Sequence, residues 1–419
     1  MVGDNTPRFD HDAATGECKG LLIEEGRKNY LENGDFVSSY GSGNFWTYGV
    51  GTDVFSASSG SQLSTNPDGS SPAYHYAPSS TAGYHRFYRT VTVDAYDTSY
   101  VASVFVKRVT AGSASNLNRY FEIELSGNLS NNPEPTGHSG SHGMSSVTFD
   151  LQDLTSQYAG NSAVKVNGLV GDPKIEDYGN GWYRLSYVFN PGQFDANSTL
   201  TAHMWLGHPA TLGSEAGNEQ GNGNPSFYIW GAMVEKGSFL TSYIPNHSGF
   251  QNTRGKDVVR IEGQEFTDFY DTSEWTLLTI TDATPASLVR SPSSVNDIGF
   301  IGTDGNNYYK IRYVTDSTLD DAYIDAYGTS NSSVQFDFGG THNEVDTSAL
   351  RNVKTAFAAK VNDTALTYNG NTVEVDTGCA LPLNVATFYI GESPKQLYVK
   401  RIMYYPKRLS NAQLVTLTS

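Results

Sequence analysis

Paired carboxylates are the first residues in this sequence whose types and spacing suit a reaction. Glycoside hydrolysis needs two carboxyl groups held several ångströms apart around a sugar, one of them with a raised pKa. Glu122 and Glu124 share one face of a predicted strand, but the chain holds 44 acidic residues, so such pairs also arise by chance. An alternating strand with its acids in solvent accounts for this pair. No Gly-x-Ser-x-Gly elbow or phosphate-binding Gly-rich loop is apparent either. We predict that the protein is not an enzyme.

Two other patterns suit a metal ion. His138 and His142 stand four residues apart, as in a helical zinc site, but the glycines and serines around them predict a loop. The segment 302–307, Gly-Thr-Asp-Gly-Asn-Asn, is rich in the oxygen ligands that Ca²⁺ prefers. Asp304 is the first candidate ligand for a structural calcium, and a plain turn is the alternative. We expect no other cofactor.

Aromatic side chains offer a third kind of chemistry, sugar recognition. Sugar rings present apolar C–H faces that stack on exposed Trp and Tyr, while nearby polar groups bond the hydroxyls. Trp182 and Trp230 lie in alternating strands, which predicts that they pack in a core. The candidate ligand contacts are Trp46, Tyr74, Tyr76, Tyr323 and Tyr327. The alternative is that these rings fill the interior of a sandwich.

Short β-strands must position these residues. The clearest alternation runs from Tyr120 to Leu125, where Phe121, Ile123 and Leu125 face one way. Near the C-terminus, Asn369-Gly370 joins two short strands and favours a type I′ turn, so we expect a hairpin over 364–375. The only helix that the pattern predicts spans Ser410 to Leu417, with Ser410 as its N-cap.

Composition agrees with strands and excludes several partners. The chain has 42 Gly, 27 Tyr and 20 Phe but only 27 Lys and Arg together, which favours strands and turns over surface helices. A dispersed net charge of −17 repels phosphate backbones and anionic lipids, so we expect no nucleic acid and no membrane insertion. Only Cys18 and Cys379 occur, which argues against a disulfide framework. The first residues lack the apolar run of a secretory signal, so we expect synthesis in a cytoplasm.

The domain organisation follows from a polar run after Pro245. The 419 residues are enough for two main domains, and the segment 243–257 cannot continue a central strand. We therefore predict an all-β protein with two antiparallel β-sandwich (jelly-roll) domains. The expected divisions are an N-terminal leader or docking segment over 1–29, a first sandwich over 30–250 and a second over 251–419.

Three blocks of this sequence resemble surface proteins of tailed bacteriophages. They are 7–16 with 20–29, then 180–186 with 229–245, and last 366–375 with 388–391, 399–406 and 408–414. The first two are similar to the leader and closing strands of a carbohydrate-binding-module-like jelly roll. The third is similar to the end of a concanavalin A-like (laminin G-type) domain. The resemblance covers most of the chain, and the loops between the blocks match nothing that we can name.

The resemblance implies a structural protein on the surface of a tailed-phage virion, made in the host bacterial cytoplasm. It would be a fibre, appendage or head-decoration subunit that binds host cell-surface glycans. Expected partners are other virion proteins, bound through residues 1–29, and further copies of the chain, with a trimer as in fibre-like relatives. One alternative is a tailspike-type polysaccharide depolymerase, and another is an architectural virion brick without sugar binding, because one fold serves many roles.

Overall fold

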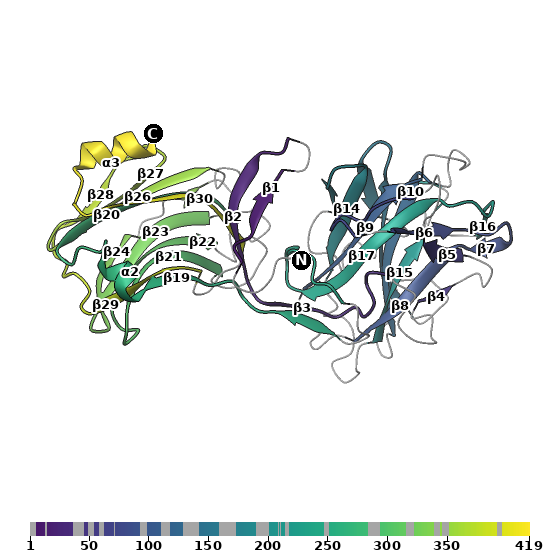
Figure 1. Cartoon of the computed structure of the whole chain (residues 1–419), viewed down its shortest axis with the longest axis horizontal. Helices are drawn as coiled ribbons and strands as arrows, with labels where there is room; N and C mark the ends of the chain where they lie inside the picture. Colours follow the sequence, from purple (N-terminus) through teal and green to yellow (C-terminus); the bar gives the residue numbers. More distant parts are fainter. Residues whose placement is uncertain are drawn as a thin grey trace. The chain divides into compact units, whose positions relative to one another are not determined.

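The computed structural model describes most of the chain. The described residues are 6–12, 15–36, 46–48, 54–57, 63–70, 72–92, 99–109, 118–128, 142–158, 173–189, 201–207, 209, 211–213, 218–246, 251–283, 294–315, 322–338, 344–345, 352–391 and 396–419. They form antiparallel sheets with little helix, which confirms the predicted all-β class of antiparallel sandwiches (Figure 1).

The chain divides into two compact units. One, here the terminal unit, combines Met1–Gly26 with Gly255–Ser419, and the other, the central unit, comprises Arg27–Arg254. The expected boundary near residue 250 falls close to the second crossing point. The central unit begins and ends on paired strands, because β3 (Arg27–Asn29) is antiparallel to β18 (Asn252–Arg254) with Arg27 opposite Arg254.

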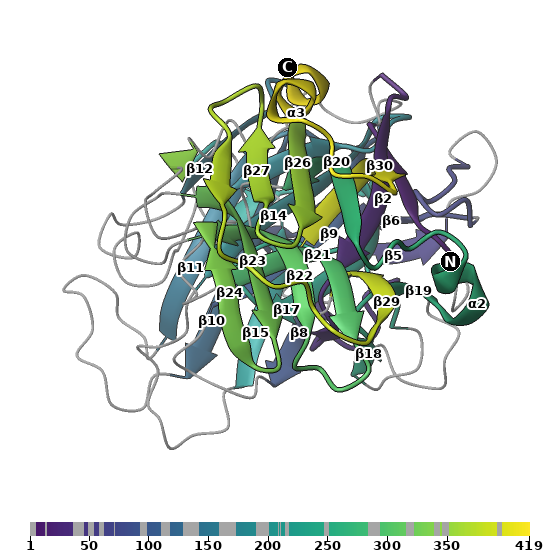
Figure 2. The ribbon, with the colours of Figure 1, turned by 90° about the vertical axis from the view of Figure 1, so that its left-hand side faces the viewer.

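The terminal unit is a sandwich of two sheets. In spatial order, sheet I contains β1 (Phe9–His11), β2 (Cys18–Glu24), β30 (Gln396–Tyr405), β20 (Glu274–Ala283), β26 (Val353–Lys360), β27 (Thr364–Tyr368) and β28 (Glu374–Asp376). Sheet II contains β19 (Val259–Glu262), β29 (Val385–Ile390), β21 (Ser294–Gly302), β22 (Tyr308–Thr315), β23 (Ala322–Ser330) and β24 (Ser333–Asp337), and β25 (Glu344–Val345) also pairs with β23. Figure 2 shows β29, β21, β22, β23 and β24 side by side.

Aromatic rings fill the space between sheets I and II. Trp275 of β20 is fully buried and lies 4.8 Å from the Phe300 ring, 5.2 Å from Phe357 and 6.0 Å from Tyr309, measured between ring centroids. Alternation explains the arrangement, since every second residue of β20 and β22 points inward. Burial of side chains of this size contributes roughly 2–3 kcal/mol each.

The N-terminal segment corrects our expectation of a separate leader. Strand β2 pairs with β30 from Leu21 opposite Val399 to Glu24 opposite Gln396, so the segment is part of sheet I. Ile23 is buried in the terminal core, and Gly20 lies so close to the Val399 carbonyl that no Cβ would fit. The apolar run Leu21-Leu22-Ile23 is the physical reason, because it needs a partner surface in order to leave water.

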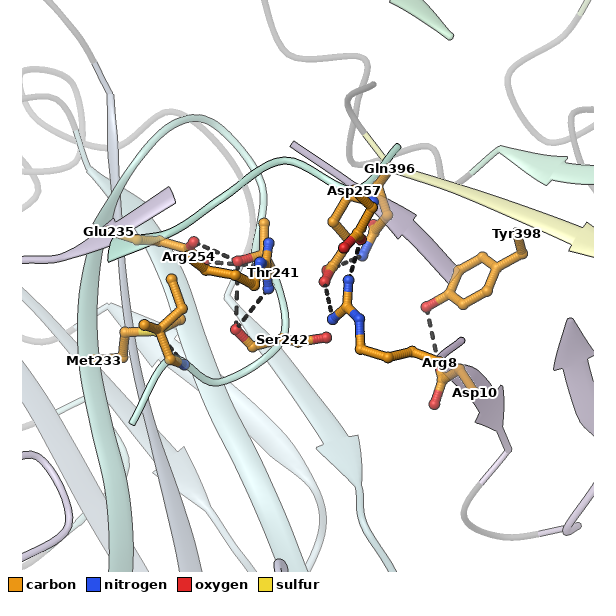
Figure 3. Close-up of polar contacts among 12 residues, drawn as sticks. Arg8, Asp10, Met233, Glu235, Thr241, Ser242, Arg254, Asp257, Gln396 and Tyr398 are labelled. Atoms are coloured by element: carbon orange, nitrogen blue, oxygen red, sulfur yellow. Dashed lines mark hydrogen bonds and ion pairs between the residues drawn. The ribbon is translucent and has the colours of Figure 1, made fainter. Parts of the chain in front are cut away.

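Polar contacts fix this segment to the rest of the terminal unit. Arg8 forms ion pairs with the buried Glu24 carboxylate at 2.8 Å and with Asp257, as Figure 3 shows for the latter. Gln396 donates to Glu24 at 3.3 Å, and the Glu24 amide donates to Asp257 at 2.8 Å. Because a buried carboxylate is costly unless it is paired, this network selects one position for β2 on the sheet.

The central unit is also a two-layered sandwich. In spatial order, sheet III contains β12 (Thr155–Tyr158), β11 (His142–Asp150), β10 (Tyr120–Asn128), β15 (Thr201–Gly207), β8 (Arg86–Thr92) and β4 (Thr47–Tyr48). Sheet IV contains β13 (Lys174–Asp177), β14 (Trp182–Phe189), β9 (Tyr100–Arg108), β17 (Phe227–Lys236), β3 and β18, with β6 (Tyr74–Ala77) on β17 and β5 (Val54–Ala57) on β6. A small ladder joins β7 (Ala82–Tyr84) to β16 (Asn218–Gln220).

The core of the central unit lies between sheets III and IV. Phe121, Ile123 and Leu125 of β10 are buried there, together with Val104 of β9 and Leu185 of β14. The predicted alternation over 120–125 is therefore confirmed.

Two helices occur among the described residues. The expected C-terminal one is confirmed as α3 (Asn411–Thr418), which Ser410 caps in a reciprocal capping box with Gln413. It packs against β26 and β27 and buries Leu414 (Figure 2). The short helix α2 (Gly263–Thr267), which buries Phe266, was not expected. Neither helix has the length and apolar character that crossing a membrane would require.

The predicted hairpin at 364–375 is also confirmed. Strands β27 and β28 pair from Thr364 opposite Asp376 to Leu366 opposite Glu374. Asn369 and Gly370 have φ of 46° and 73°, and the Asn371 amide donates to the Tyr368 carbonyl at 2.9 Å. These are the features of a turn with both central residues at positive φ.

Candidate functional site

Three of the predicted sugar-contacting aromatics lie in or against the central core. The Trp46 ring stacks on Phe36 with 4.7 Å between centroids, and its Nε1 donates to the Asn33 carbonyl at 3.1 Å. Tyr76 is fully buried in the same core, and Tyr74 packs partly against it. Both tyrosines belong to strand β6 and not to a loop. The burial of Trp46 and Tyr76 corrects their assignment to a sugar-facing surface, whereas Tyr74 is only half-buried and stays a prediction.

Trp182 and Trp230 are buried as expected, but on the outer face of sheet IV. There they form a second aromatic cluster with Phe105 and Tyr228. Ala73 belongs to this cluster, and the segment 63–70 reaches it, because the Trp182 Nε1 donates to the Thr65 carbonyl at 2.9 Å. The central unit therefore hides these outer aromatics beneath its own chain.

Tyr327, another predicted ligand contact, does not lie in a core. Tyr327 of β23 is half-buried on the outer face of sheet II, and its ring stacks on Tyr308 of β22 with 5.9 Å between centroids and 29° between planes. Cross-strand register explains the pairing, because Tyr327 is opposite Lys310 and Tyr308 is two residues before it. Tyr323 belongs to β23, and its side chain lies outside the described residues.

Charged residues surround this ring pair. Arg312 donates from Nε and Nη2 to the two carboxylate oxygens of Asp325 at 2.7 and 2.6 Å, and its guanidinium lies 4.5 Å from the Tyr327 ring centroid. Its Nη2 also lies 3.2 Å from Asp337, whose side chain is 46% exposed. We call Tyr308, Tyr327, Lys310, Arg312, Asp297, Asp325 and Asp337 the tyrosine face.

Lys310 occupies the middle of the tyrosine face. Its Nζ lies 3.4 Å from Asp297 and 4.9 Å above the Tyr308 ring, so one cation contacts both a carboxylate and a π-face. The Tyr389 hydroxyl donates to the same Asp297 carboxylate at 3.4 Å. Neighbouring strands thus hold the polar groups around the rings in defined positions.

Burial shapes the protonation of this face. Removal from water raises the pKa of the Asp325 carboxyl, and the hydrogen bonds and positive charge of Arg312 offset only part of that rise. Removal from water also raises the pKa of Tyr327, together with the nearby Tyr308 and Asp337. Both shifts favour the uncharged forms of the Asp325 and Tyr327 side chains.

The carboxylate pair of β10 is not in solvent, contrary to our expectation. Glu122 and Glu124 are 2% and 1% exposed, although they point away from the central core. Glu124 lies 3.1 Å from Arg86, and Glu122 accepts a hydrogen bond from Ser146. These interactions give both carboxylates a structural role in the outer layer of sheet III.

Of the metal candidates, Asp304 lies in a turn, whereas His142 belongs to a strand and not to the expected loop. The Asp304 carboxylate accepts hydrogen bonds from the Asn306 amide and the Asn307 side chain, both at 2.9 Å, which stabilises its own turn. His138 lies outside the described residues, whereas His142 begins β11 opposite Asn128. Within the described ranges, no three His, Cys, Asp or Glu side chains gather as they would around a metal ion.

The block 229–245 has a structural explanation. Glu235 is fully buried and accepts from the Thr241 amide at 2.7 Å and the Thr241 hydroxyl at 2.6 Å (Figure 3). Burial raises the pKa of Glu235, while the positive charges of Arg27 and Arg184 oppose that rise. Gly237 has a φ of 142°, and the Arg27 guanidinium occupies the space that a Cβ at this position would need. These residues lock the end of β17 and do not form a ligand site.

Sequence reasoning missed most of the tyrosine face. Tyr308, Lys310 and Arg312 are not among the candidates that we named from the sequence. The alternation of β22 places Tyr308 on the same side as these cations, and that was the available signal. The pairing with Tyr327 depends on the register of β23, which the sequence does not show.

Comparisons with known proteins assign the chain to no family. No protein-family model matches the chain, and no curated protein matches it in sequence. Among solved structures, domains LG4-5 of the mouse laminin α1 chain are similar, with 9% sequence identity over 83% of this chain and 96% of that chain. The TM-score is 0.23, and we draw no argument from a likeness at that level.

Proposed function

We propose that this protein is a surface component of a bacteriophage virion that recognises host glycans through the tyrosine face and carries out no catalytic step. The observation that supports recognition is the half-buried ring stack of Tyr308 and Tyr327, flanked by ordered donors and acceptors. Apolar platforms beside polar groups suit sugars, whose rings have C–H faces edged by hydroxyls.

Removal of one ring tests glycan recognition. On an array of bacterial surface glycans, Tyr327→Ala should weaken binding roughly 5–30-fold, the effect of losing about 1–2 kcal/mol of stacking. Tyr308→Ala should have a similar effect. The control is Tyr84→Ala, because Tyr84 is also exposed, at 55%, but belongs to β7 of the central unit. Equal losses of glycan binding in all three variants, or no glycan binding by the unchanged protein, would contradict the proposed recognition.

The virion context rests on the three sequence blocks and has its own test. Immunogold electron microscopy with an antibody against the central unit should label particles of the encoding phage. Unlabelled particles would exclude a virion role. Analytical ultracentrifugation of the purified chain would decide whether it forms the proposed trimer.

We also propose a surface for docking to other virion proteins through the N-terminal segment. Phe9 is 60% exposed on β1, the edge strand of sheet I. We propose that this edge contacts the particle. Phe9→Ser should reduce incorporation without unfolding the chain, whereas truncation would confuse docking with folding, because β2 is part of the terminal sandwich.

An architectural role without sugar binding is the second candidate. The observation in its favour is that Trp46 and Tyr76, two of the aromatics expected to face ligand, are buried in the central core. In that case the glycan array would show no binding while immunogold labelling stayed positive.

A further inference from the structure

The charge balance of the tyrosine face bears on which sugars it would accept, and this inference rests on the glycan recognition proposed above. Two cations, Lys310 and Arg312, face three carboxylates, those of Asp297, Asp325 and Asp337. We infer that the tyrosine face selects neutral glycans and rejects those that carry carboxylate or sulfate groups.

The geometry of Arg312 is the first support. An arginine that captures an acidic sugar uses its planar fork of donors for bidentate contact. In this protein, Asp325 already accepts two bonds from that fork, and its side chain is only 1% exposed. An anionic sugar would have to displace a buried internal carboxylate, which would leave that carboxylate without its cation.

The surroundings of Lys310 are the second support. Its ammonium lies between Asp297 and the Tyr308 ring, so a carboxylate and a π-face already balance its charge. The third is Asp337, the most exposed of the three carboxylates, at 46%. It offers acceptor oxygens beside the Tyr327 ring that suit sugar hydroxyls and would repel an anion.

Matched glycan pairs test the inference on the full chain. The array should carry neutral oligosaccharides beside counterparts of equal length in which one sugar is a uronic acid or is sulfated. We expect binding to neutral members, with little change between 50 and 300 mM salt, because no ion pair with the ligand forms. Stronger binding to acidic members, weakened by salt, would overturn the inference and leave glycan recognition intact. No binding to either class would overturn both.

Two variants should reverse the preference. Asp325→Asn keeps the side-chain shape and releases the fork of Arg312, so binding of acidic members should rise by about tenfold or more, as for one charge-assisted contact. Asp337→Asn removes a charge at an exposed position, where the fold should tolerate it, and should raise acidic binding less. The control, Glu17→Gln, makes the same charge change in the exposed turn between β1 and β2. Unchanged preference in both Asp variants, with thermal unfolding confirming that they are folded, would contradict the inference.

Discussion

The two units treat aromatic side chains on the outer faces of their sheets in opposite ways. In the central unit, Trp182 and Trp230 lie on the outer face of sheet IV, yet they are 2% and 6% exposed under other segments of the chain. In the terminal unit, Tyr308 and Tyr327 occupy the outer face of sheet II and remain half-exposed. An aromatic outer face is therefore not a binding surface in itself, because a covering segment converts it into a second core.

The units also differ in how they stabilise the strand beside the point where the chain passes from one unit to the other. The terminal unit places the Glu24 carboxylate, at the end of β2, between Arg8 and Gln396. The central unit places Arg27, the first residue of β3, over the Phe239 ring at 4.5 Å and near the buried Glu235. Both use a buried charge at the point where the chain passes between units, but the segments that supply the partners differ.

The largest expected effect is on the stability of the terminal unit, because its sheet I includes strand β2 from a segment distant in sequence. Deletion of residues 1–24 removes β1 and β2, exposes the edge of β30 and leaves the terminal core without Ile23. The terminal unit should lose cooperative unfolding, since removing one buried isoleucine side chain alone costs roughly 2–5 kcal/mol. Urea unfolding should then retain only the transition of the central unit, with its midpoint unchanged. Two unchanged transitions would contradict the assignment of β2 to sheet I.

The next effect lies in the central unit. Glu235→Ala removes the buried carboxylate that accepts from the Thr241 amide and hydroxyl, near the positive charges of Arg27 and Arg184, which should cost roughly 1.5–3 kcal/mol. Urea denaturation should show the central transition at a lower midpoint, with the terminal transition unmoved. Glu235→Gln serves as the control for shape, because it retains an acceptor for Thr241 but not the charge. If the Gln variant is as stable as the unchanged protein, the charge is not the stabilising feature.

A smaller effect is expected at the last helix. Ser410→Ala removes the side chain that accepts from the Gln413 amide and should cost about 1 kcal/mol. Because α3 covers Ala356, Ala358 and Ala365 on sheet I, only the terminal transition should move. Ser410→Asp should restore most of the stability, since Asp is also a good N-cap. A shift of both transitions would show that the two units do not unfold independently.

The smallest effect is a difference in acid response. Burial disfavours ionisation of Asp150 in the central unit, but hydrogen bonds from Arg119 and from the Gln152 and Asp153 amides outweigh it and lower its pKa. A lowered carboxyl pKa gives stability that is present above the unfolded value of about 3.9 and is lost as pH falls through the folded value. The pKa of Asp325 is raised, so its ionised form opposes folding above its folded pKa, and acid relieves that cost.

Urea midpoints measured between pH 3 and 6 would compare the two carboxyl groups directly. Asp150→Asn should make the central transition less sensitive to acid, while Asp325→Asn should make the terminal transition more sensitive. The same change of slope in both variants would refute the opposite pKa shifts.

Local patterns predicted the elements of this fold well, but not which strands become neighbours. Alternation located β10, Asn369-Gly370 located a hairpin, and Ser410 located a helix start, because each depends on residues close in sequence. The place of β2 in sheet I depends on its pairing with β30, which is distant in sequence. Local patterns therefore predicted only a leader over 1–29. Glu122 and Glu124 show the same limit: period 2 identified their face, but their burial depends on Arg86 and Ser146 from other strands.

The candidate site was predictable in part, for a related reason. Tyr327 was singled out because tyrosines are frequent around it, and Trp46 was singled out on similar grounds. Both sequence contexts are rich in aromatics, yet the fold places one ring beside Tyr308 at the surface and the other against Phe36 in a core. Composition therefore indicates the ring chemistry that is present, whereas the register of the sheets decides which rings can reach a ligand.

The pairing of β2 with β30 has a consequence for synthesis on the ribosome. Strand β2 is translated long before its partner β30. By contrast, the central unit is complete once Arg254 has emerged, so we expect it to fold first. Until β30 has been translated, Leu21 and Ile23 have no partner strand in the nascent chain. Proteolysis of ribosome-bound chains stalled after residue 300 should find the central unit protected and residues 8–24 still cleavable.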